Sequence, residues 1–333
     1  MEILRYGSGG SSVCRGCAIA IGNFDGVHRG HQAVLEATAR AAASVAGPMA
    51  VMVFEPHPRS YFRPDLPLFR LTPLEVKAHL MAALGVDCLA VLDFDASLAA
   101  LPAGDFVADI LVRDLGARHV VIGYDFCFGK ARQGNAGLLR DMGAALGFGV
   151  TVVERVNIGT DAAVPYSSSE IRRLLRDGEP RAAAELLGYW WTVIGEVVEG
   201  DRRGRTIRFP TANIRLSGEG EPRLGVYAVR ARAADGGEPW TGVANLGRRP
   251  TFDKQDVLLE VHLLDFAGDL YGRSLIVEFI EFLRPERKFS GLDELKAQIA
   301  ADAAAARAMH DRLARNGDPM ERFALGRRFV PGS

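Results

Sequence analysis

Two histidines are the side chains of this sequence best placed to do chemistry. His28 and His31 lie in the stretch Gly22–His31 (GNFDGVHRGH), between the apolar run Ala18–Ile21 and a helical pattern. A strand, a glycine-rich turn and a helix start together direct backbone N–H groups and the positive end of a helix dipole toward a phosphate. The spacing places both imidazoles on one face of the first helical turn, where both can reach that phosphate. The stretch therefore predicts that ATP binds around this turn with its α-phosphate open to attack.

The elements around this stretch indicate a parallel sheet. Short β-rich runs alternate with longer helical patterns, which is typical of a doubly wound α/β domain with right-handed crossovers. Ligands of such sheets bind beyond the carboxyl ends of the strands, where the histidine stretch lies. The predicted strands are Ala18–Ile21, Ala50–Phe54, Cys88–Phe94, His119–Ile122 and Val150–Val153. The predicted helices are Gln32–Ala43, Pro73–Leu84, Ala103–Leu115 and Ala136–Leu146.

Three further segments share this predicted edge of the sheet. Phe54–Arg59 (FEPHPR), with Phe62 shortly after, follows the second strand, and Gly123–Lys130 (GYDFCFGK) follows the fourth. Tyr166–Arg172 (YSSSEIR) precedes a short helix, so one serine is a natural N-cap, and its hydroxyls, N–H groups and arginine can cradle a second phosphate. Each segment also has a plain structural explanation, because aromatic side chains usually pack and serines often cap helices. Their common position favours function.

Composition and charge limit the class of protein. The chain of 333 residues is long enough for two domains, and 48% hydrophobic and 24% charged residues are typical of a globular protein. A net charge of −1 gives no reason to expect nucleic acid or a membrane surface as a partner. Because no run approaches the roughly 18 apolar residues of a membrane span and no secretory signal is recognised, we expect a cytoplasmic protein with small-molecule substrates. A homo-oligomer is left open.

The cysteines do not indicate a metal site. Four cysteines are too few for a disulfide framework in a chain of this length. Cys14 and Cys17 form a C-x-x-C pair, but neither Cys88 nor Cys127 supplies a second pair at the spacing of a structural zinc site. We interpret the pair as a chance feature of a loose leader, residues 1–17, while a metal or redox role stays open.

The second half of the chain changes character near Gly188. Strand-like runs are punctuated by glycine, and several alternate apolar and polar residues. Successive antiparallel strands without intervening helices predict a small closed or nearly closed barrel. A helix over Leu292–Leu313 and a loosely attached extension, residues 316–333, should follow. The predicted strands are Trp191–Val198, Gly225–Ala231, Gly242–Leu246, Leu258–Leu264 and Ser274–Phe282.

This half carries a second set of residues suited to chemistry. Gly200–Arg205 (GDRRGR) is a basic loop whose N–H groups can wrap phosphates, and Thr211 and Asn213 offer a hydroxyl and an amide that can hold Mg²⁺. Glu260 is the one carboxylate within the apolar strand Leu258–Leu264. Aimed into the mouth of a barrel, it would be suited to act as the general base for a substrate hydroxyl. Alternation alone equally allows a solvated glutamate on the outer face.

Motifs narrow the choice of enzyme. The chain contains no G-x-x-x-x-G-K-[ST] and no G-x-G-x-x-G, which excludes a Walker-type site and weakens an oxidoreductase interpretation. His-x-Gly-His on such a sheet resembles the nucleotidyltransferase superfamily, whose members join the α-phosphate of a nucleoside triphosphate to an acceptor and release pyrophosphate. With both halves in view, nearly the whole chain resembles the bacterial bifunctional riboflavin kinase/FAD synthetase family. The matching stretches are Gly22–Gln32, Phe54–Phe62, Gly123–Gly129, Ser167–Arg172, Gly200–Asn213, Gly225–Tyr227, Asn245–Phe252, Leu259–His262, Tyr271–Gly272 and Arg284–Phe289.

The resemblance implies an activity for each half. It implies an FMN adenylyltransferase domain over residues 1–187, a riboflavin kinase barrel with a C-terminal helix over residues 188–315, and an extension over residues 316–333. ATP, riboflavin, FMN and FAD would be substrates or products, with Mg²⁺ as cofactor. Neither transfer needs a covalent enzyme intermediate, so positioning and charge neutralisation should carry the catalysis.

The resemblance also assigns residues. In the first domain it assigns His28 and His31 to the ATP phosphates, and the rest of the nucleotide to Gly22, Asn23, Phe24, Asp25, Gly26 and Gly30. The opposite side of the triphosphate would be held by Ser167, Ser168, Ser169 and Arg172. The flavin would be surrounded by His57, Phe62, Asp125, Phe126 and Phe128. In the barrel the resemblance gives Gly200, Gly204 and Arg205 to the nucleotide, Thr211 and Asn213 to Mg²⁺, and Glu260 to the role of base.

Two departures from the family pattern keep alternatives open. Tyr166–Ser169 replaces an aliphatic residue, two serines and a threonine, which preserves the hydroxyl. Arg208 stands where the family has glycine, and it could crowd the kinase nucleotide or add a phosphate contact. The alternative is therefore an FMN adenylyltransferase whose barrel is a weakly active or regulatory flavin-binding module. In a third hypothesis the first domain uses an acceptor other than FMN.

Overall fold

The protein packs as two compact units. The computed structural model describes residues 1–6, 14–66, 68–157, 165–199, 209–216, 221–248, 257–318 and 320. Among the described residues, the first unit is formed by Met1–Leu68 and Lys77–Ser167, and the second by Phe69–Val76 and the chain from Ser168 to Met320. The second unit thus includes one segment, Phe69–Val76, that lies in the first half of the sequence. The predicted boundary between the two domains, between residues 187 and 188, stays a prediction.

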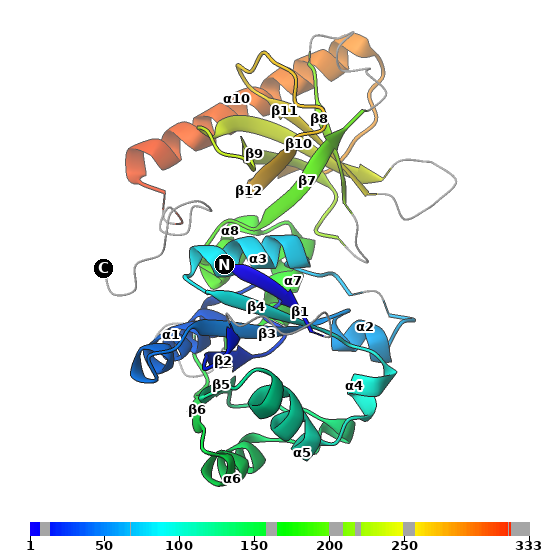
Figure 1. Ribbon diagram of the computed structural model, residues 1–333. Helices are drawn as coiled ribbons and strands as arrows, with labels where there is room; N and C mark the ends of the chain where they lie inside the picture. The colour runs from blue at the N-terminus through cyan, green and yellow to red at the C-terminus, as the bar shows by residue number, and fades with distance from the viewer. Residues whose placement is uncertain are drawn as a thin grey trace. The chain divides into compact units, whose positions relative to one another are not determined.

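The first unit is built on a six-stranded parallel sheet with the order β1-β4-β3-β2-β5-β6 (Figure 1). Buried aliphatic side chains dominate these strands, as expected for a parallel sheet covered on both faces. The predicted strands are confirmed within about a residue at each end. The bounds are β1 Glu2–Arg5, β2 Ala18–Ile21, β3 Met49–Glu55, β4 Cys88–Asp93, β5 His119–Gly123 and β6 Gly149–Val153.

Helices connect and cover these strands. Side-chain caps start several of them, as with Asn135 at α6, and Gly147 ends α6 in the left-handed conformation that glycine adopts without strain. The predicted helix over 103–115 is a short α-helix that continues as a π-helix, η2. The bounds are α1 Arg29–Ser44, α2 Pro58–Phe62, α3 Leu74–Ala83, α4 Ala96–Ala100, α5 Ala103–Asp105, η2 Phe106–Asp114, η3 Lys130–Arg132 and α6 Ala136–Leu146.

The prediction of a loose leader is wrong for its described part. Glu2–Arg5 forms β1, which pairs in parallel with Cys88–Val91 of β4 at the edge of the sheet. Leu4 is the one buried residue of the four, so the run carries little apolar signal and the tertiary pairing defines it. Cys14 is also fully buried, and it is disulfide-bonded to Cys88 rather than associated with Cys17.

Cys17 remains a free thiol in the core. Burial raises its pKa to about 11, so it stays protonated at neutral pH and lacks the thiolate that redox and metal chemistry require. Among the described residues, no group of three or more His, Cys, Asp or Glu side chains is arranged to hold a metal. The structure therefore gives the C-x-x-C pair no support as a functional motif.

The second unit is built on a closed antiparallel barrel with the order β10-β11-β8-β7-β12-β9. The barrel and the helix after it confirm the predicted architecture. The sequence missed β8, whose five residues are too short for alternation to stand out. The bounds are α7 Ser168–Asp177, α8 Pro180–Leu187, β7 Thr192–Val198, β8 Ala212–Leu216, β9 Gly225–Ala233, β10 Trp240–Arg248, β11 Val257–Leu263, β12 Ser274–Arg284 and α10 Leu292–Asn316.

The long helix α10 packs on the outer wall of the barrel, beside β9 and β10 (Figure 1). Ala303 and Ala306 of α10 share a buried apolar cluster with Ala228 and Val243 of these strands. Small residues on the helix allow its backbone to approach the sheet closely. The wall residues that face α10 are therefore outward-facing, which fixes the direction of the other side chains on the same strands.

The start of the predicted loose extension is anchored. Asp318 accepts a hydrogen bond from Trp190 Nε1 (3.1 Å) and pairs with Arg230 Nη1 (2.8 Å), whose guanidinium also binds Glu278. Met320 is 4% exposed and joins the apolar cluster of Trp190. The chain just beyond α10 is therefore part of the barrel unit. The pattern could not reveal this, because a single acidic residue after a helix has no periodicity.

Candidate functional site

The turn after β2 is tightly specified. Gly22 N donates to Met52 O (3.2 Å), and Val27 N donates to Phe24 O (3.1 Å). Phe24 and Val27 both have positive φ, which is rare for a bulky and especially for a β-branched residue. Both side chains are buried, and Gln32 Nε2 holds Val27 O at 2.8 Å. Backbone held in such conformations by its surroundings is typical of functional sites.

His28 and His31 form a stacked pair at the start of α1. His28 is the N-cap residue, and its Nδ1 accepts a hydrogen bond from His31 N (3.3 Å). The two ring centroids lie 3.6 Å apart with the planes inclined by 17°. A Cβ on Gly30 would lie 3.2 Å from two atoms of the His28 ring, so the absence of a side chain at position 30 leaves room for that ring. The prediction that both imidazoles share one face is confirmed.

His31 is neutral in the free protein. Burial, the neighbouring His28 and the ammonium of Lys77 together hold its pKa well below the ordinary value of 6.5. Its Nδ1 is buried and has no hydrogen-bond partner among the described residues. An unpartnered polar atom in such a position is costly unless a ligand or water meets it. The site is therefore prepared for a polar group that the protein itself does not supply.

The neighbouring strand ends bring the predicted flavin residues to the same edge. His57 follows β3 and caps α2 through Nδ1, which accepts from Arg59 N (3.0 Å). Phe62 of α2 is 60% exposed and lies edge-on to the ring of Phe94 after β4 (5.6 Å). Asp125 is exposed after β5. These positions flank β2 in the strand order, which agrees with the predicted common edge.

Phe126 and Phe128 differ in exposure. Their rings stack at 5.7 Å, but Phe128 is only 6% exposed and also packs on Phe106 of η2 (5.4 Å). Gly134 leaves room for the Phe128 ring, since a Cβ there would lie 2.6 Å from it. Phe128 therefore belongs to the core, and Phe126 is the ring of this pair that can reach a ligand.

The serine-rich segment and Arg172 are divided between the units. Ser167 ends the first unit, whereas α7 begins at Ser168, includes Ser169 and belongs to the second. Arg172 is buried, and its Nε donates to Phe69 O (2.6 Å), which fixes the segment Phe69–Val76 on the second unit. The assignment of these residues to the triphosphate held by His28 and His31 stays a prediction.

Two of the predicted kinase residues, Asn213 and Glu260, lie in one row across the barrel together with Asn245, which the sequence does not predict. Glu260 on β11 lies directly opposite Asn213 on β8 and Asn245 on β10. Directly opposite residues of antiparallel strands project from the same face. Leu259 and Val261, which alternate with Glu260, are fully buried. Asn245 shares its face of β10 with Val243, which contacts α10, so the row lies on the outer wall.

The expectation that Glu260 points into the barrel mouth is therefore wrong. Aliphatic and aromatic side chains such as Leu259 and Phe279 fill the interior, and Glu260 stands on the outer face, where it is half-buried rather than solvated. His262, two residues along on the same face, packs against Phe209 (5.4 Å) and its Nδ1 lies 2.9 Å from Pro210 O. The segment before β8 thus lies beside this face and brings Thr211 near it.

Asn213 has the most distinctive environment in the row. Its side chain is 5% exposed, and Nδ2 donates to Thr211 O at 3.3 Å. Its Oδ1 is buried without a partner among the described residues. Gly200, Gly204, Arg205 and Arg208 lie outside the described residues, so their predicted roles, and the alternative that rests on Arg208, stay predictions.

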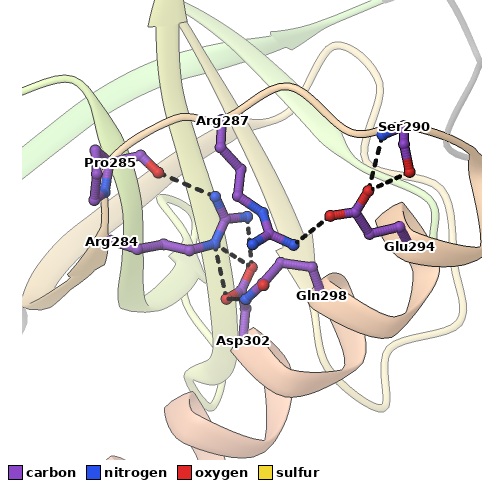
Figure 2. Close-up of polar contacts among 7 residues, drawn as sticks. All are labelled: Arg284, Pro285, Arg287, Ser290, Glu294, Gln298 and Asp302. Carbon is purple, nitrogen blue, oxygen red and sulfur yellow. Dashed lines mark hydrogen bonds and ion pairs between the residues drawn. The ribbon is translucent and has the colours of Figure 1, made fainter.

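A network of ion pairs holds the chain after β12 to α10 (Figure 2). Arg284 pairs with Asp302 through Nε and Nη2, at 3.0 and 2.8 Å, and Asp302 also accepts from Gln298 (2.8 Å). Glu294 accepts from the backbone and hydroxyl of Ser290 and from Arg287, as Figure 2 shows. The connection from β12 to α10 is thereby fixed at both ends.

Between these two fixed ends lies Glu286, whose Oε1 accepts from Asn245 Nδ2 at 3.2 Å. Sequence reasoning did not single out Asn245 or Glu286, although both fall in stretches that match the family. It also missed Lys77, a buried cation near His31. The burial of a helical lysine is decided by tertiary packing, and the position opposite Glu260 is decided by strand register. Neither leaves a local pattern.

A cavity of about 120 Å³ in the second unit contains none of the predicted site residues. It lies between the segment Phe69–Val76 and the strands β7 and β8, and its lining is mostly apolar. In the described part of the chain, no helix combines the length and apolar character needed to cross a membrane.

The first unit is a parallel α/β fold with a stacked histidine pair at a helix start, and the second is a closed barrel that carries Glu260 between Asn213 and Asn245. The FAD synthetase family model matches residues 11–168, and the riboflavin kinase model matches residues 187–310. The chain belongs to the bifunctional riboflavin kinase/FMN adenylyltransferase family, in the same domain order. It is therefore a transferase that combines a nucleotidyltransferase domain with a kinase domain.

Curated relatives match along most of their length. The bifunctional riboflavin kinase/FMN adenylyltransferase of Escherichia coli K12 is 44% identical over 88% of this chain and 92% of its own. The enzyme of the same name from Haemophilus influenzae is 42% identical over 92% of this chain and 99% of its own. A solved structure described as a macrolide-efflux protein from Streptococcus pneumoniae is similar with a TM-score of 0.78 and 29% identity, covering 92% of this chain and 98% of that one.

Proposed function

We propose that the protein makes FMN and then FAD. The barrel transfers the γ-phosphoryl group of ATP to the 5′-hydroxyl of riboflavin, and the first domain transfers the adenylyl group of a second ATP to the phosphate of FMN. Family membership supports both activities, and the residues of the two candidate sites would perform them.

The stacked histidine pair is the observation that carries the adenylyl transfer. An oxygen of the FMN phosphate forms a bond to the α-phosphorus of ATP, the bond from that phosphorus to the β-phosphate oxygen breaks, and pyrophosphate leaves. Charge builds on the α-phosphate, where the first N–H groups of α1 and the imidazoles of His28 and His31 can stabilise it. Because the turn is pre-formed, little reorganisation is needed during the reaction.

The row Asn213–Glu260–Asn245 supports the kinase step. Glu260 accepts the proton of the riboflavin 5′-hydroxyl. The hydroxyl oxygen bonds to the γ-phosphorus of ATP, the bond from that phosphorus to the β-phosphate oxygen breaks, and ADP leaves. The half-buried position of Glu260 limits competing water. Asn213 and Asn245, which lie directly opposite Glu260 on the neighbouring strands, add no charge of their own beside the carboxylate. Glu286 in turn positions Asn245.

The donor set fits the Mg²⁺ that the family implies. Mg²⁺ prefers oxygen ligands, and the buried, unpartnered Oδ1 of Asn213 is such an atom. We propose that Asn213 and Thr211 hold the ion. When bound, it would neutralise the charge of the nucleotide phosphates.

The flavin of FMN is proposed to lie at the edge formed by α2 and the chain after β5. The exposed ring of Phe62 and the ring of Phe126 offer apolar faces, while His57 and Asp125 offer polar atoms. Phe128 would support Phe126 from the core.

We infer that the enzyme works in the cytoplasm. A homo-oligomer would appear in light scattering as a mass above the 36.0 kDa of one chain.

A two-product assay tests the proposal. Riboflavin, ATP and Mg²⁺ should yield FMN and then FAD with the purified protein, and FMN with ATP should yield FAD and pyrophosphate. FMN without FAD would refute the adenylyltransferase half. FAD formed only when FMN is supplied would refute the kinase half and favour a regulatory barrel. Replacing FMN by other phosphorylated acceptors tests the third hypothesis, which predicts product with one of them.

A further inference from the structure

Lys77 is buried although it carries a charge. Its side chain is 2% exposed and begins on the first turn of α3, and its Nζ lies 3.8 Å from Oε1 of Glu55, itself only 12% exposed. Lysine is almost never fully buried without a partner. A buried ion pair is, however, a weak source of stability, because the cost of removing two charges from water offsets their attraction. The position of Lys77 therefore calls for a role beyond holding the fold.

The ammonium group lies at the reactive edge of the sheet. Glu55 is the last residue of β3, and β3 pairs in parallel with β2, the strand that leads into the histidine turn. Gly22, the first residue of that turn, donates to Met52 of β3. Glu55 thus holds the lysine at the same edge of the sheet as the turn. The charge is close enough to lower the pKa of His31.

The reaction at this edge needs positive charge. Adenylyl transfer brings a nucleoside triphosphate and a phosphate monoester together, and both are anions. In the free protein the pKa of His31 is too low for it to carry that charge at neutral pH. Lys77 is a described cation of the first unit that is buried at the same sheet edge as the histidine pair, where its charge lowers the pKa of His31. A charge in a buried site acts on phosphate more strongly than one in water.

We propose that Lys77 is a catalytic residue of the adenylyl transfer, whose ammonium group binds the α-phosphate of ATP together with His28 and His31. Lys77 keeps its proton throughout and donates hydrogen bonds to the α-phosphate oxygens while the bond to FMN forms and pyrophosphate leaves. Glu55 positions the ammonium group before ATP arrives. The inference rests on the proposed function of the histidine pair and adds the group that neutralises charge there.

A purely structural ion pair makes a different prediction. If Lys77 only ties α3 to β3, replacing it with methionine, which has a similar shape, should cost stability because buried Glu55 loses the ammonium group of Lys77. Replacing both members of the pair should then restore a normal protein, because such double replacements are often neutral or stabilising. The two explanations can be separated with the intact chain.

The experiment compares K77M, K77R and the double variant K77M/E55Q. We expect K77M to lower kcat for FAD formation from FMN on the order of a hundredfold to a thousandfold, the usual cost of losing one such donor. K77R should recover part of the rate, because it keeps the charge. The double variant should remain as slow as K77M, since no cation is restored. Riboflavin phosphorylation, measured on the same samples, should stay within about twofold.

Two controls make the result decisive. R40M removes an exposed cation from α1, the helix of the histidine pair, and should leave both activities unchanged. Thermal unfolding checks that each variant is folded. FAD formation within about threefold of wild type in K77M, or its recovery in the double variant, would overturn the role of Lys77 alone. Wild-type protein that forms no FAD would overturn the proposed function and this inference with it.

Discussion

The two candidate sites of this protein are assembled in different ways. In the first unit the central residues come from one continuous stretch, Gly22–His31, whose geometry is fixed by hydrogen bonds within it and to Gln32 and Met52. In the second unit Asn213, Asn245, Glu260 and Glu286 come from four separate segments, and the register of the barrel brings them together. A contiguous site can be recognised from sequence, whereas a site that depends on strand register needs the fold.

This difference predicts how each site responds to damage. The histidine turn is locally determined, so substitutions in it should abolish one activity without disturbing the barrel. The kinase row shares its strands with the barrel core, where Leu259 and Val261 are fully buried beside Glu260. Substitutions there must preserve shape if they are to test chemistry rather than folding. The variants below follow that distinction.

The largest effect is expected at the histidine pair. His28→Ala or His31→Ala should lower FAD formation on the order of a hundredfold to a thousandfold, because each removes a polar group aimed at the charge of the transition state. FMN formation from riboflavin should stay nearly intact. Separate measurement of FMN and FAD by chromatography checks this. An equal loss of both products would show that the two halves are not independent.

The complementary effect is expected at Glu260. Glu260→Gln keeps the shape but removes the base, and it should lower riboflavin phosphorylation by about a hundredfold, the lower end of the range for general base catalysis. Adenylation of supplied FMN should be unchanged. Initial rates of ADP release with riboflavin and of pyrophosphate release with FMN measure the two steps. A kinase rate within about threefold of wild type would exclude Glu260 as the base.

A smaller effect should come from Gly30→Ala. The added methyl group would lie 3.2 Å from the His28 ring and 3.4 Å from Tyr166 Cβ, so the ring must shift. A misplacement of this kind should lower FAD formation about tenfold, which corresponds to about 1.4 kcal/mol in the barrier. Gly104→Ala is the matched control, because a Cβ there meets nothing within 4 Å. Equal rates for the two variants would contradict the packing argument.

The smallest effect concerns pH and stability. The pKa of His31 is lower in the folded protein than the 6.5 of an unfolded chain, so below that pH the unfolded state binds more protons. The folded state should therefore lose stability as pH falls from about 6.5, by at most about 1.4 kcal/mol per pH unit from this group. His31→Gln should show a shallower fall in urea unfolding between pH 7.5 and 5.5. Identical slopes would mean that His31 does not contribute.

Several parts of the fold were predictable because they leave local patterns. The strands β2 to β5 are buried apolar runs and β6 is a half-buried one, while α1 and α6 carry helical periodicity between them. By contrast, β1 and β8 are short, and only their partner strands define them. Glu260 illustrates the same limit within a site. Alternation placed it and its neighbours on opposite faces of β11, but only barrel closure decided which face is inside.

The sequence by itself determined the histidine turn, the order of the two domains and the residue types at each site, because these depend on contacts within about ten neighbouring positions and on motif spacing. Tertiary structure alone decided the row Asn213–Glu260–Asn245, the attachment of Phe69–Val76 to the second unit and the burial of Lys77 beside Glu55. These features arise from strand register and side-chain burial, which join residues far apart in the chain and leave no periodic trace in it.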